Sequence, residues 1–152
     1  MEMINGYKLI KEFTNENAGF CRWAYAEKGG HLYFIKQFMS PKFPLDNAML
    51  SEKAMKARLK LCVDFAERKH RLYSALGKVR TGNIVVAEEF FREGSSFYIV
   101  TDFVQKEGSP DISQVSMLPD EKKILLIRTI LYSIMKMHEQ RIVHADIKPT
   151  NI

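Results

Sequence analysis

The feature that most constrains the fold is a helical stretch over residues 51–76, with strand-like segments on both sides of it. The stretch contains neither glycine nor proline, and Gly77 follows it as a helix C-cap would. Apolar side chains recur along it at helical spacing: Leu61, Phe65, Leu72 and Leu76. A helix of this length excludes an all-β chain, and the strands around it exclude an all-α one. The sequence therefore predicts an α+β fold.

Five apolar runs with strand character surround this helix, over residues 7–13, 20–26, 32–38, 84–91 and 97–104. A Gly29-Gly30 turn joins the second run to the third, and the five residues 92–96 join the last two. Two prolines, Pro41 and Pro44, then prevent the third run from continuing as a strand. We expect an antiparallel five-stranded sheet packed on one long helix, followed by a polar break and a second helix from Pro119 to about Glu139.

The chain of 152 residues is 46% hydrophobic, which suits one globular domain with a core. Lys and Arg number 23 against 18 Asp and Glu, for a net charge of +5. Much of the basic charge falls in residues 53–71 of the helix. Binding of nucleic acid through that helix is one interpretation, but the excess is small and a solvated basic face explains it better.

The two cysteines, Cys21 and Cys62, do not have metal-ligand spacing, and the charged amino terminus lacks the apolar core of a signal peptide. No apolar run approaches the roughly 18 residues that a membrane span needs. We therefore expect a soluble, cytoplasmic protein without a membrane segment in this chain.

The segment from His144 to Asn151 carries the clearest chemistry. It places the carboxylate of Asp146, the ammonium of Lys148 and the carboxamide of Asn151 in one short loop. Phosphoryl transfer uses such a set, because a carboxylate can orient a hydroxyl and accept its proton while a cation stands beside the moving phosphate. An amide oxygen can help to hold Mg²⁺.

This segment resembles the catalytic loop of the eukaryotic-type protein kinases, in the H-R-D-x-K-P-x-N form of the Ser/Thr branch. The resemblance implies ATP and Mg²⁺ as cofactors and the Ser or Thr hydroxyl of a protein as substrate. It implies that Asp146 orients this hydroxyl, that Lys148 neutralises charge at the γ-phosphate and that Asn151 binds Mg²⁺. Ala145 replaces the arginine with which many kinases bind a phosphate on the activation segment.

Two earlier segments match the same family. Residues 33–36 end in Lys36 on the third predicted strand, which implies that Lys36 anchors the α- and β-phosphates. Gly19, seventeen positions before it, matches the last glycine of the phosphate loop, but Thr14 and Glu16 stand where the family has the other two. Phe34 stands where the family usually has alanine above the adenine, so we expect its ring to crowd that site.

The resemblance also implies a helix glutamate and a hinge. Glu67 is the candidate in the long helix to pair with Lys36. The alternative is an exposed Glu67 that pairs with Arg71, one turn later. Thr101 would be the gatekeeper, and the backbone groups of Asp102 and Val104 would bind the adenine edge.

We accordingly expect residues 1–104 to form a kinase small lobe and hinge, and residues 105–152 to begin the large lobe through the catalytic loop. The family's D-F-G metal site would follow Ile152, so the sequence is interpreted as an incomplete kinase, inactive by itself, from a longer and divergent bacterial-like parent. The alternative is a pseudokinase-like module that binds nucleotide or a partner without turnover. The incomplete glycine loop and Phe34 favour that alternative, whereas Lys36, Asp146, Lys148 and Asn151 together favour an enzyme.

Overall fold

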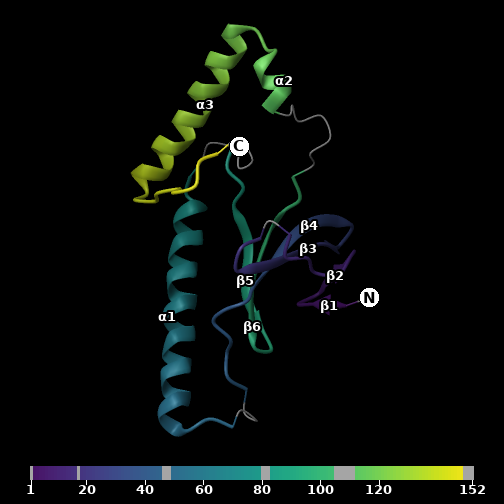
Figure 1. Ribbon diagram of the computed structural model, residues 1–152, viewed down its shortest axis with the longest axis vertical. Helices are drawn as coiled ribbons and strands as arrows, with labels where there is room; N and C mark the ends of the chain where they lie inside the picture. Colours follow the sequence, from purple (N-terminus) through teal and green to yellow (C-terminus); the bar gives the residue numbers. More distant parts are fainter. Residues whose placement is uncertain (1, 17, 46–48, 80–82, 105–111, 149–152) are drawn as a thin grey trace. The chain divides into compact units, whose positions relative to one another are not determined.

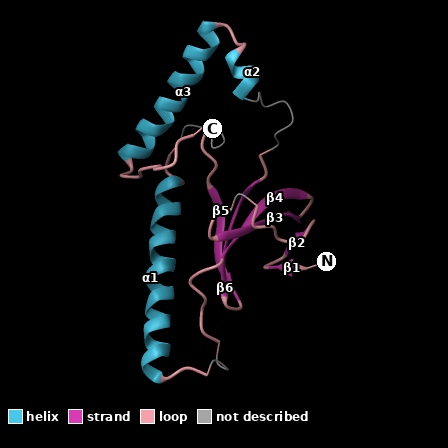
Figure 2. Cartoon of the chain, in the orientation of Figure 1, coloured by secondary structure: helices cyan, strands magenta, loops and turns pink. Residues whose placement is uncertain are grey.

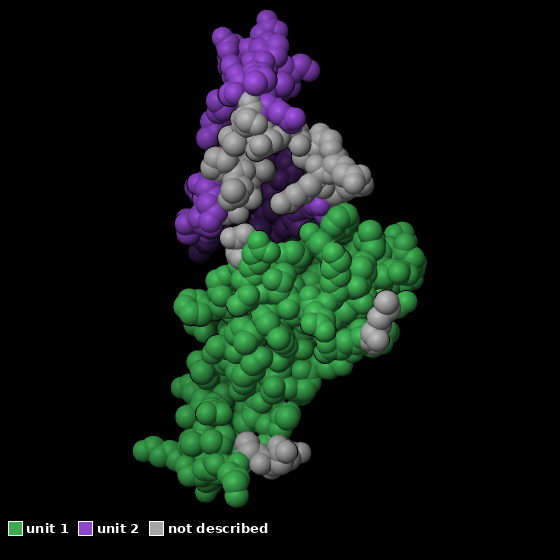
Figure 3. Space-filling view, turned by 45° about the vertical axis from the view of Figure 1, so that its right-hand side comes forward, with its two compact units in different colours: residues 1–73, 86–103 green, residues 74–85, 104–152 purple. Residues whose placement is uncertain are grey.

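The computed structural model describes residues 2–16, 18–45, 49–79, 83–104 and 112–148. The chain divides into two compact units, coloured separately in Figure 3. The first comprises Met1–Tyr73 and Val86–Phe103, and the second comprises Ser74–Val85 and Val104–Ile152. The assignment of residues 1–104 and 105–152 to the two lobes of a kinase remains a prediction.

The first unit contains a six-stranded antiparallel sheet, one strand more than predicted, in the order β1-β2-β3-β4-β6-β5. Its strands are β1 Met3–Ile4, β2 Tyr7–Leu9, β3 Cys21–Lys28, β4 His31–Phe38, β5 Ala87–Glu93 and β6 Ser96–Asp102. The extra strand, β1, pairs with β2 through a turn at Asn5 and Gly6, both of which have positive φ (48° and 81°). An Asn-Gly pair favours this kind of hairpin turn, so the signal was present although β1 itself is too short to show periodicity.

Several boundaries also differ from those predicted. β2 ends at Leu9 rather than continuing to residue 13, and β5 begins at Ala87 rather than at residue 84. The β5–β6 turn contains two residues, Gly94 and Ser95, instead of five, and Gly94 adopts a positive φ of 56°. Thus the two predicted hairpins are present as β3–β4 and β5–β6, whereas the strand ends and the length of the second turn differ from those predicted.

The sheet curls, so that side chains of β2 and β5 meet across its inner face. A buried cluster covers its inner face: Ile4, Tyr7, Leu9, Ala24, Ala26, Ile35, Tyr98 and Val100. The ring of Tyr7 on β2 stacks 6.3 Å from that of Phe91 on β5, and the Tyr7 hydroxyl donates to Glu89 Oε2 at 2.9 Å. These contacts join one end of the sheet order to the other and hold the curl closed.

The long helix, α1 (Glu52–Leu76), packs on the opposite face of the sheet, and Figure 1 shows it running alongside the strands. Phe65 of α1 lies 5.2 Å from Phe38 and 5.3 Å from Phe97, measured between ring centroids. Cys62, which is 1% exposed, fills the space beside them. Each such ring removes a large apolar area from water, so this aromatic layer stabilises the docked helix.

The second unit contains the helices α2 (Ile112–Ser116) and α3 (Asp120–Glu139), which Figure 2 shows joined by a short connection. Pro119 is the N-cap of α3, and Asp120 and Glu121 place negative charge in its first turn. The helix predicted from Pro119 to about Glu139 is therefore present as α3, whereas α2 was not predicted. No helix in the described part of the chain is both long and apolar enough to cross a membrane.

Candidate active site

Lys36 lies on β4, a central strand paired on both sides. Its neighbours in the sheet are Trp23 on β3 and Ile99 on β6. The Lys36 ammonium lies 5.8 Å from the centroid of the Phe34 ring. Because β4 is hydrogen-bonded along both edges, the backbone at Lys36 is fixed, and the side chain emerges on the face of the sheet that carries α1.

Aromatic rings fill the same face beside Lys36. Phe34 lies 5.4 Å from Trp23 in a stacked arrangement and 6.1 Å from Tyr25 in an edge-on one. Tyr25 in turn meets Phe103 edge-on at 5.1 Å. Phe34 is therefore part of a four-ring cluster, where the family resemblance would place alanine at that position.

The loop that contains Gly19 is tied to β3 by the single tryptophan. Thr14 and Trp23 exchange backbone hydrogen bonds of 2.9 and 2.8 Å, and the Trp23 indole N–H donates to the Glu16 carbonyl at 2.8 Å. Gly19 has a φ of 58°, a conformation that residues with a side chain rarely adopt. Glycine at this position therefore has a structural reason.

The face of α1 that packs on the sheet does not include Glu67. Successive helical residues turn by about 100°, and the buried or ring-contacting side chains share one side of the helix: Cys62, Phe65, Ala66, Lys69 and Tyr73. Glu67 is exposed, about 140° around the helix axis from the centre of that side. Among the described residues no ion pair joins Lys36 to Glu67, so their predicted pairing has no support from this arrangement.

Lys69 stands on the sheet-facing side instead. Its ammonium lies 4.9 Å from the centroid of Phe38 and 5.6 Å from that of Phe65. Burial lowers the pKa of Lys69, and the nearby charges of Lys36 and Arg68 lower it further. Sequence reasoning missed this residue, although its spacing of four from both Phe65 and Tyr73 placed it on the apolar side of the helix.

The hinge candidates follow from β6. Thr101 pairs with Phe34 in the sheet, and its hydroxyl donates to the Asp102 carbonyl at 3.3 Å. Asp102 pairs with Tyr33, and the next residue, Phe103, donates its backbone N–H to the Leu32 carbonyl at 3.4 Å. Val104 belongs to the second unit, where its side chain is exposed. Thr101 and Asp102 are thus fixed by β4, the strand that carries Lys36.

The end of α3 leads directly into the candidate catalytic loop. Arg141 has a φ of 59° and donates its backbone N–H to the His138 carbonyl at 2.8 Å. The N–H of Ile142 reaches the Met137 carbonyl at 3.0 Å. This pair of bonds is the Schellman ending of a helix, which turns the chain sharply at a left-handed residue. Residues 142–143 lie outside any strand.

The loop itself brings two of its three predicted residues together. The Lys148 ammonium lies 3.0 Å from Asp146 Oδ2, and both side chains are more than half exposed. The backbone N–H of Asp146 donates to His144 Nδ1 at 3.3 Å, and Ala145 between them has a φ of 61°. Asn151 lies outside the described residues. In the described part of the chain no group of three or more His, Cys, Asp or Glu side chains is placed to hold a metal ion.

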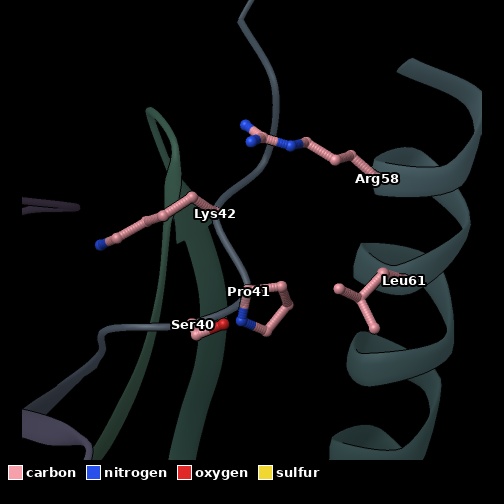
Figure 4. Close-up of a pocket in the computed structure, with 5 residues that line it drawn as sticks. All are labelled: Ser40, Pro41, Lys42, Arg58 and Leu61. Carbon is pink, nitrogen blue, oxygen red and sulfur yellow. The ribbon is translucent and has the colours of Figure 1, made fainter. Parts of the chain in front are cut away.

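The site residues divide between the two units. Lys36, Glu67, Gly19, Thr101 and Asp102 belong to the first unit, and Val104, Asp146 and Lys148 to the second. A separate pocket in the first unit lies between the turn after β4 and α1, lined by Ser40, Pro41, Lys42, Arg58 and Leu61 (Figure 4). None of these is a predicted site residue. Lys42 points away from Arg58, and its ammonium donates to Ser96 Oγ at 2.7 Å.

Comparison with known sequences decides the family. The protein kinase domain family matches residues 45–152, more than half of the chain. The chain belongs to the protein kinase domain family. The curled antiparallel sheet with its long helix is accordingly the architecture of a kinase small lobe, although it has six strands in place of the expected five.

Several curated kinases are distant relatives of this kinase-family chain. It is 25% identical, over 159 positions and 98% of its length, to a calcium/calmodulin-dependent protein kinase kinase of Caenorhabditis elegans. It is 30% identical over 77 positions to the serine/threonine-protein kinase TIO of Arabidopsis thaliana, and 32% identical over 87 positions to the serine/threonine-protein kinase PSK2 of Saccharomyces cerevisiae. These two matches cover 51% and 54% of the chain. The chain spans 29%, 6% and 8% of the three relatives' own lengths, so it corresponds to less than a third of each.

Proposed function

We propose that this chain supplies the nucleotide-binding and catalytic-loop residues of a Ser/Thr protein kinase that uses ATP and Mg²⁺. The observation that carries the proposal is the 3.0 Å pair of Asp146 and Lys148 in an exposed loop. An exposed ion pair adds little stability, but it keeps an ammonium beside the carboxylate that would meet a substrate hydroxyl. Family membership and the distant Ser/Thr kinase relatives support the same reaction.

In this proposal the substrate oxygen forms a bond to the γ-phosphorus of ATP while the bond to the β-phosphate oxygen breaks, and ADP leaves. Asp146 orients the hydroxyl and accepts its proton, and Lys148 neutralises charge on the transferring group. Asn151 would help to hold Mg²⁺, which would supply positive charge to the phosphates. Residues 1–104 would form the small lobe and hinge, and residues 105–152 the start of the large lobe.

The remaining roles belong to the first unit. Lys36 would bind the α- and β-phosphates beneath the Gly19 loop, and Thr101, Asp102 and Val104 would border the adenine. Glu67 would hold Lys36 only if α1 turned by about 140° about its axis, so its pairing stays a prediction. A protein substrate with a Ser or Thr hydroxyl and a cytoplasmic location are also part of this proposal.

The test is phosphotransfer by the protein expressed from its native gene, with γ-labelled ATP and a mixed protein substrate. We expect incorporation of label on Ser and Thr, and losses of at least about 100-fold for Lys36→Met and for Asp146→Asn, as for removal of a general base. A Lys60→Met control on the exposed side of α1 should behave as wild type. Transfer that survives both site substitutions would show that these assignments are wrong.

A second candidate is a module that binds nucleotide or a partner without turnover. Two observations favour it: the four-ring cluster around Phe34, and the lysine in place of a carboxylate on the sheet-facing side of α1. Binding of ATP by the native protein without any transfer of label, over a range of protein substrates, would favour this module over the enzyme.

A further inference from the structure

The side of α1 that packs on the sheet carries a cation, Lys69, among aromatic rings. Its ammonium lies 4.9 Å from the centroid of Phe38, 5.6 Å from that of Phe65 and 5.9 Å from that of Tyr73. Cation–π contacts hold an ammonium in place without neutralising its charge. Lys69 is therefore positioned between helix and sheet, where a bound anion would favour its charged form.

Lys36 lies on the same side of the sheet. Alternate residues of a strand point to the same face, so Lys36 shares its face with Phe38, the ring nearest to the Lys69 ammonium. The Lys69 ammonium, over the Phe38 ring, thus lies on the face of the sheet that carries Lys36, and the charge of Lys36 contributes to the lowered pKa of Lys69. Two lysines, one from β4 and one from α1, thus converge on one region of the first unit.

No carboxylate compensates this pair within the described residues, since neither lysine takes part in an ion pair there. Glu67 is exposed and lies on another side of the helix. Bringing two like charges together in a half-buried site costs free energy, and a bound polyanion would offset that cost. This charge arrangement suits a polyphosphate better than it suits an internal lysine–glutamate pair.

We propose that Lys69 is a second phosphate-binding residue that acts with Lys36 on the polyphosphate of a nucleotide. The inference rests on the proposed function in so far as that function requires nucleotide binding. It assigns to the helix a direct contact with the ligand, in place of the indirect role in which a helix glutamate would only position the strand lysine. A charged hydrogen bond to phosphate is among the stronger polar contacts in proteins.

The experiment compares Lys69→Met with wild type in the native protein, using three probes: ATP, inorganic tripolyphosphate and adenosine. Binding is followed by calorimetry and by the fluorescence of Trp23, the only tryptophan of the sequence. Methionine keeps an unbranched stem against the aromatic rings and removes the charge. Lys60→Met, exposed on the outer side of the same helix, is the matched control.

We expect Lys69→Met to lower the affinity for ATP and for tripolyphosphate by about tenfold or more, and to leave the affinity for adenosine unchanged. The Tm of the unliganded variant should not fall, because the substitution removes an uncompensated charge. Lys69→Arg should retain most of the tripolyphosphate affinity, and Lys60→Met should match wild type. Should Lys69→Met fail to fold, Lys69→Gln gives the same comparison.

Different failures have different meanings. If Lys36→Met abolishes ATP binding while Lys69→Met binds ATP as wild type does, the role of Lys69 is overturned and the proposed function stands. If Lys69→Met lowers the affinity for adenosine as much as the affinity for ATP, Lys69 acts through packing and the inference is again overturned. If the wild-type protein binds neither ATP nor tripolyphosphate, both the inference and the nucleotide-dependent function are overturned.

Discussion

Phe34 decides what the face of the sheet beside Lys36 offers to a ligand. Its ring is stacked with Trp23 and edge-on to Tyr25, and the Lys36 ammonium lies over it at 5.8 Å. An alanine at this position would leave a space of the size of that ring beneath the strands. The side chain therefore both stabilises the unliganded sheet and restricts the room for a nucleotide base.

We expect Phe34→Ala to lower the free energy of unfolding by about 2 kcal/mol, less than a fully buried phenylalanine would because the ring is only partly covered. The same change should tighten ATP binding several-fold by opening the crowded site. Urea unfolding and calorimetric titration measure the two effects. Phe20→Ala, which removes a ring that is 92% exposed, is the control and should change neither. Weaker ATP binding by Phe34→Ala would mean that the ring supports the base instead of crowding it.

Tyr7 links the two edges of the curled sheet through one hydroxyl. Burial and the hydrogen bond to Glu89 raise the pKa of the Tyr7 hydroxyl above its usual value of 10.0. Above pH 10 the unfolded chain loses this proton while the folded chain keeps it. Deprotonation then lowers the free energy of the unfolded state only, so the free energy of unfolding falls with rising pH. Below pH 10 both states hold the proton, and the hydrogen bond contributes in full.

Tyr7→Phe should accordingly lower the free energy of unfolding at pH 7 by about 1 kcal/mol. Above pH 10 the free energy of unfolding of this variant should fall less steeply than that of wild type. Urea unfolding at several pH values measures both slopes. Tyr25→Phe is the control, because the Tyr25 hydroxyl makes no hydrogen bond to another described residue. Equal slopes for wild type and Tyr7→Phe would contradict the link between Tyr7 and alkaline stability.

At the scale of elements, hairpins and helix extents could be predicted from sequence, but the rotation of a helix about its axis could not. The Gly29-Gly30 turn and the alternating segments gave β3 and β4 to within two residues, and the gap free of glycine and proline gave α1 to within one. The side of α1 that meets the sheet depends on where Phe38, Phe90 and Phe97 lie in space. The spacing of four from Phe65 and Tyr73 indicated the side on which Lys69 lies, but charged residues occupy most sides of this helix, so that signal did not exclude Glu67.

The contact within the candidate catalytic loop was predictable for a different reason. Asp146 and Lys148 are two residues apart, so a short turn brings them together whatever the rest of the fold does. The position of Lys36 on a strand was predictable because the apolar run over residues 32–38 is a local pattern. Features that depend on long-range pairing, such as the contact of Tyr7 with Phe91 and the four rings around Phe34, have no counterpart in a local pattern.

The end of α3 gives an element-scale prediction. Arg141 adopts a left-handed φ of 59° in the Schellman ending, where a residue without a Cβ is favoured. Arg141→Gly should therefore raise the free energy of unfolding of its unit by up to about 1 kcal/mol. Thermal unfolding measures this, with Arg128→Gly inside α3 as the control, which should destabilise by about 1 kcal/mol. A loss of stability in both variants would mean that the Arg141 side chain makes a contribution larger than its backbone strain.

At the scale of the whole molecule, the two units differ in how much of their apolar surface is buried. The first unit has two buried clusters, one on each face of its sheet. In the second unit α3 leaves large apolar side chains exposed by about half or more: Ile124, Leu125, Ile127, Leu131, Tyr132 and Met135. An apolar surface of this kind favours association with other apolar groups.

We expect the 152-residue chain to bind a hydrophobic dye and to self-associate as its concentration rises, with α3 as the cause. The double variant Ile127→Glu and Leu131→Lys replaces two residues that are 55% and 59% exposed, and it places a favourable i,i+4 charge pair on the helix. Dye fluorescence and the mass from light scattering should both fall toward those of a monomer. The control Lys122→Glu, also on α3 but at an exposed polar position, should leave both unchanged. Self-association that persists in the double variant would mean that Ile127 and Leu131 are not its cause, and that other exposed apolar residues such as Phe20 and Met49 of the first unit contribute.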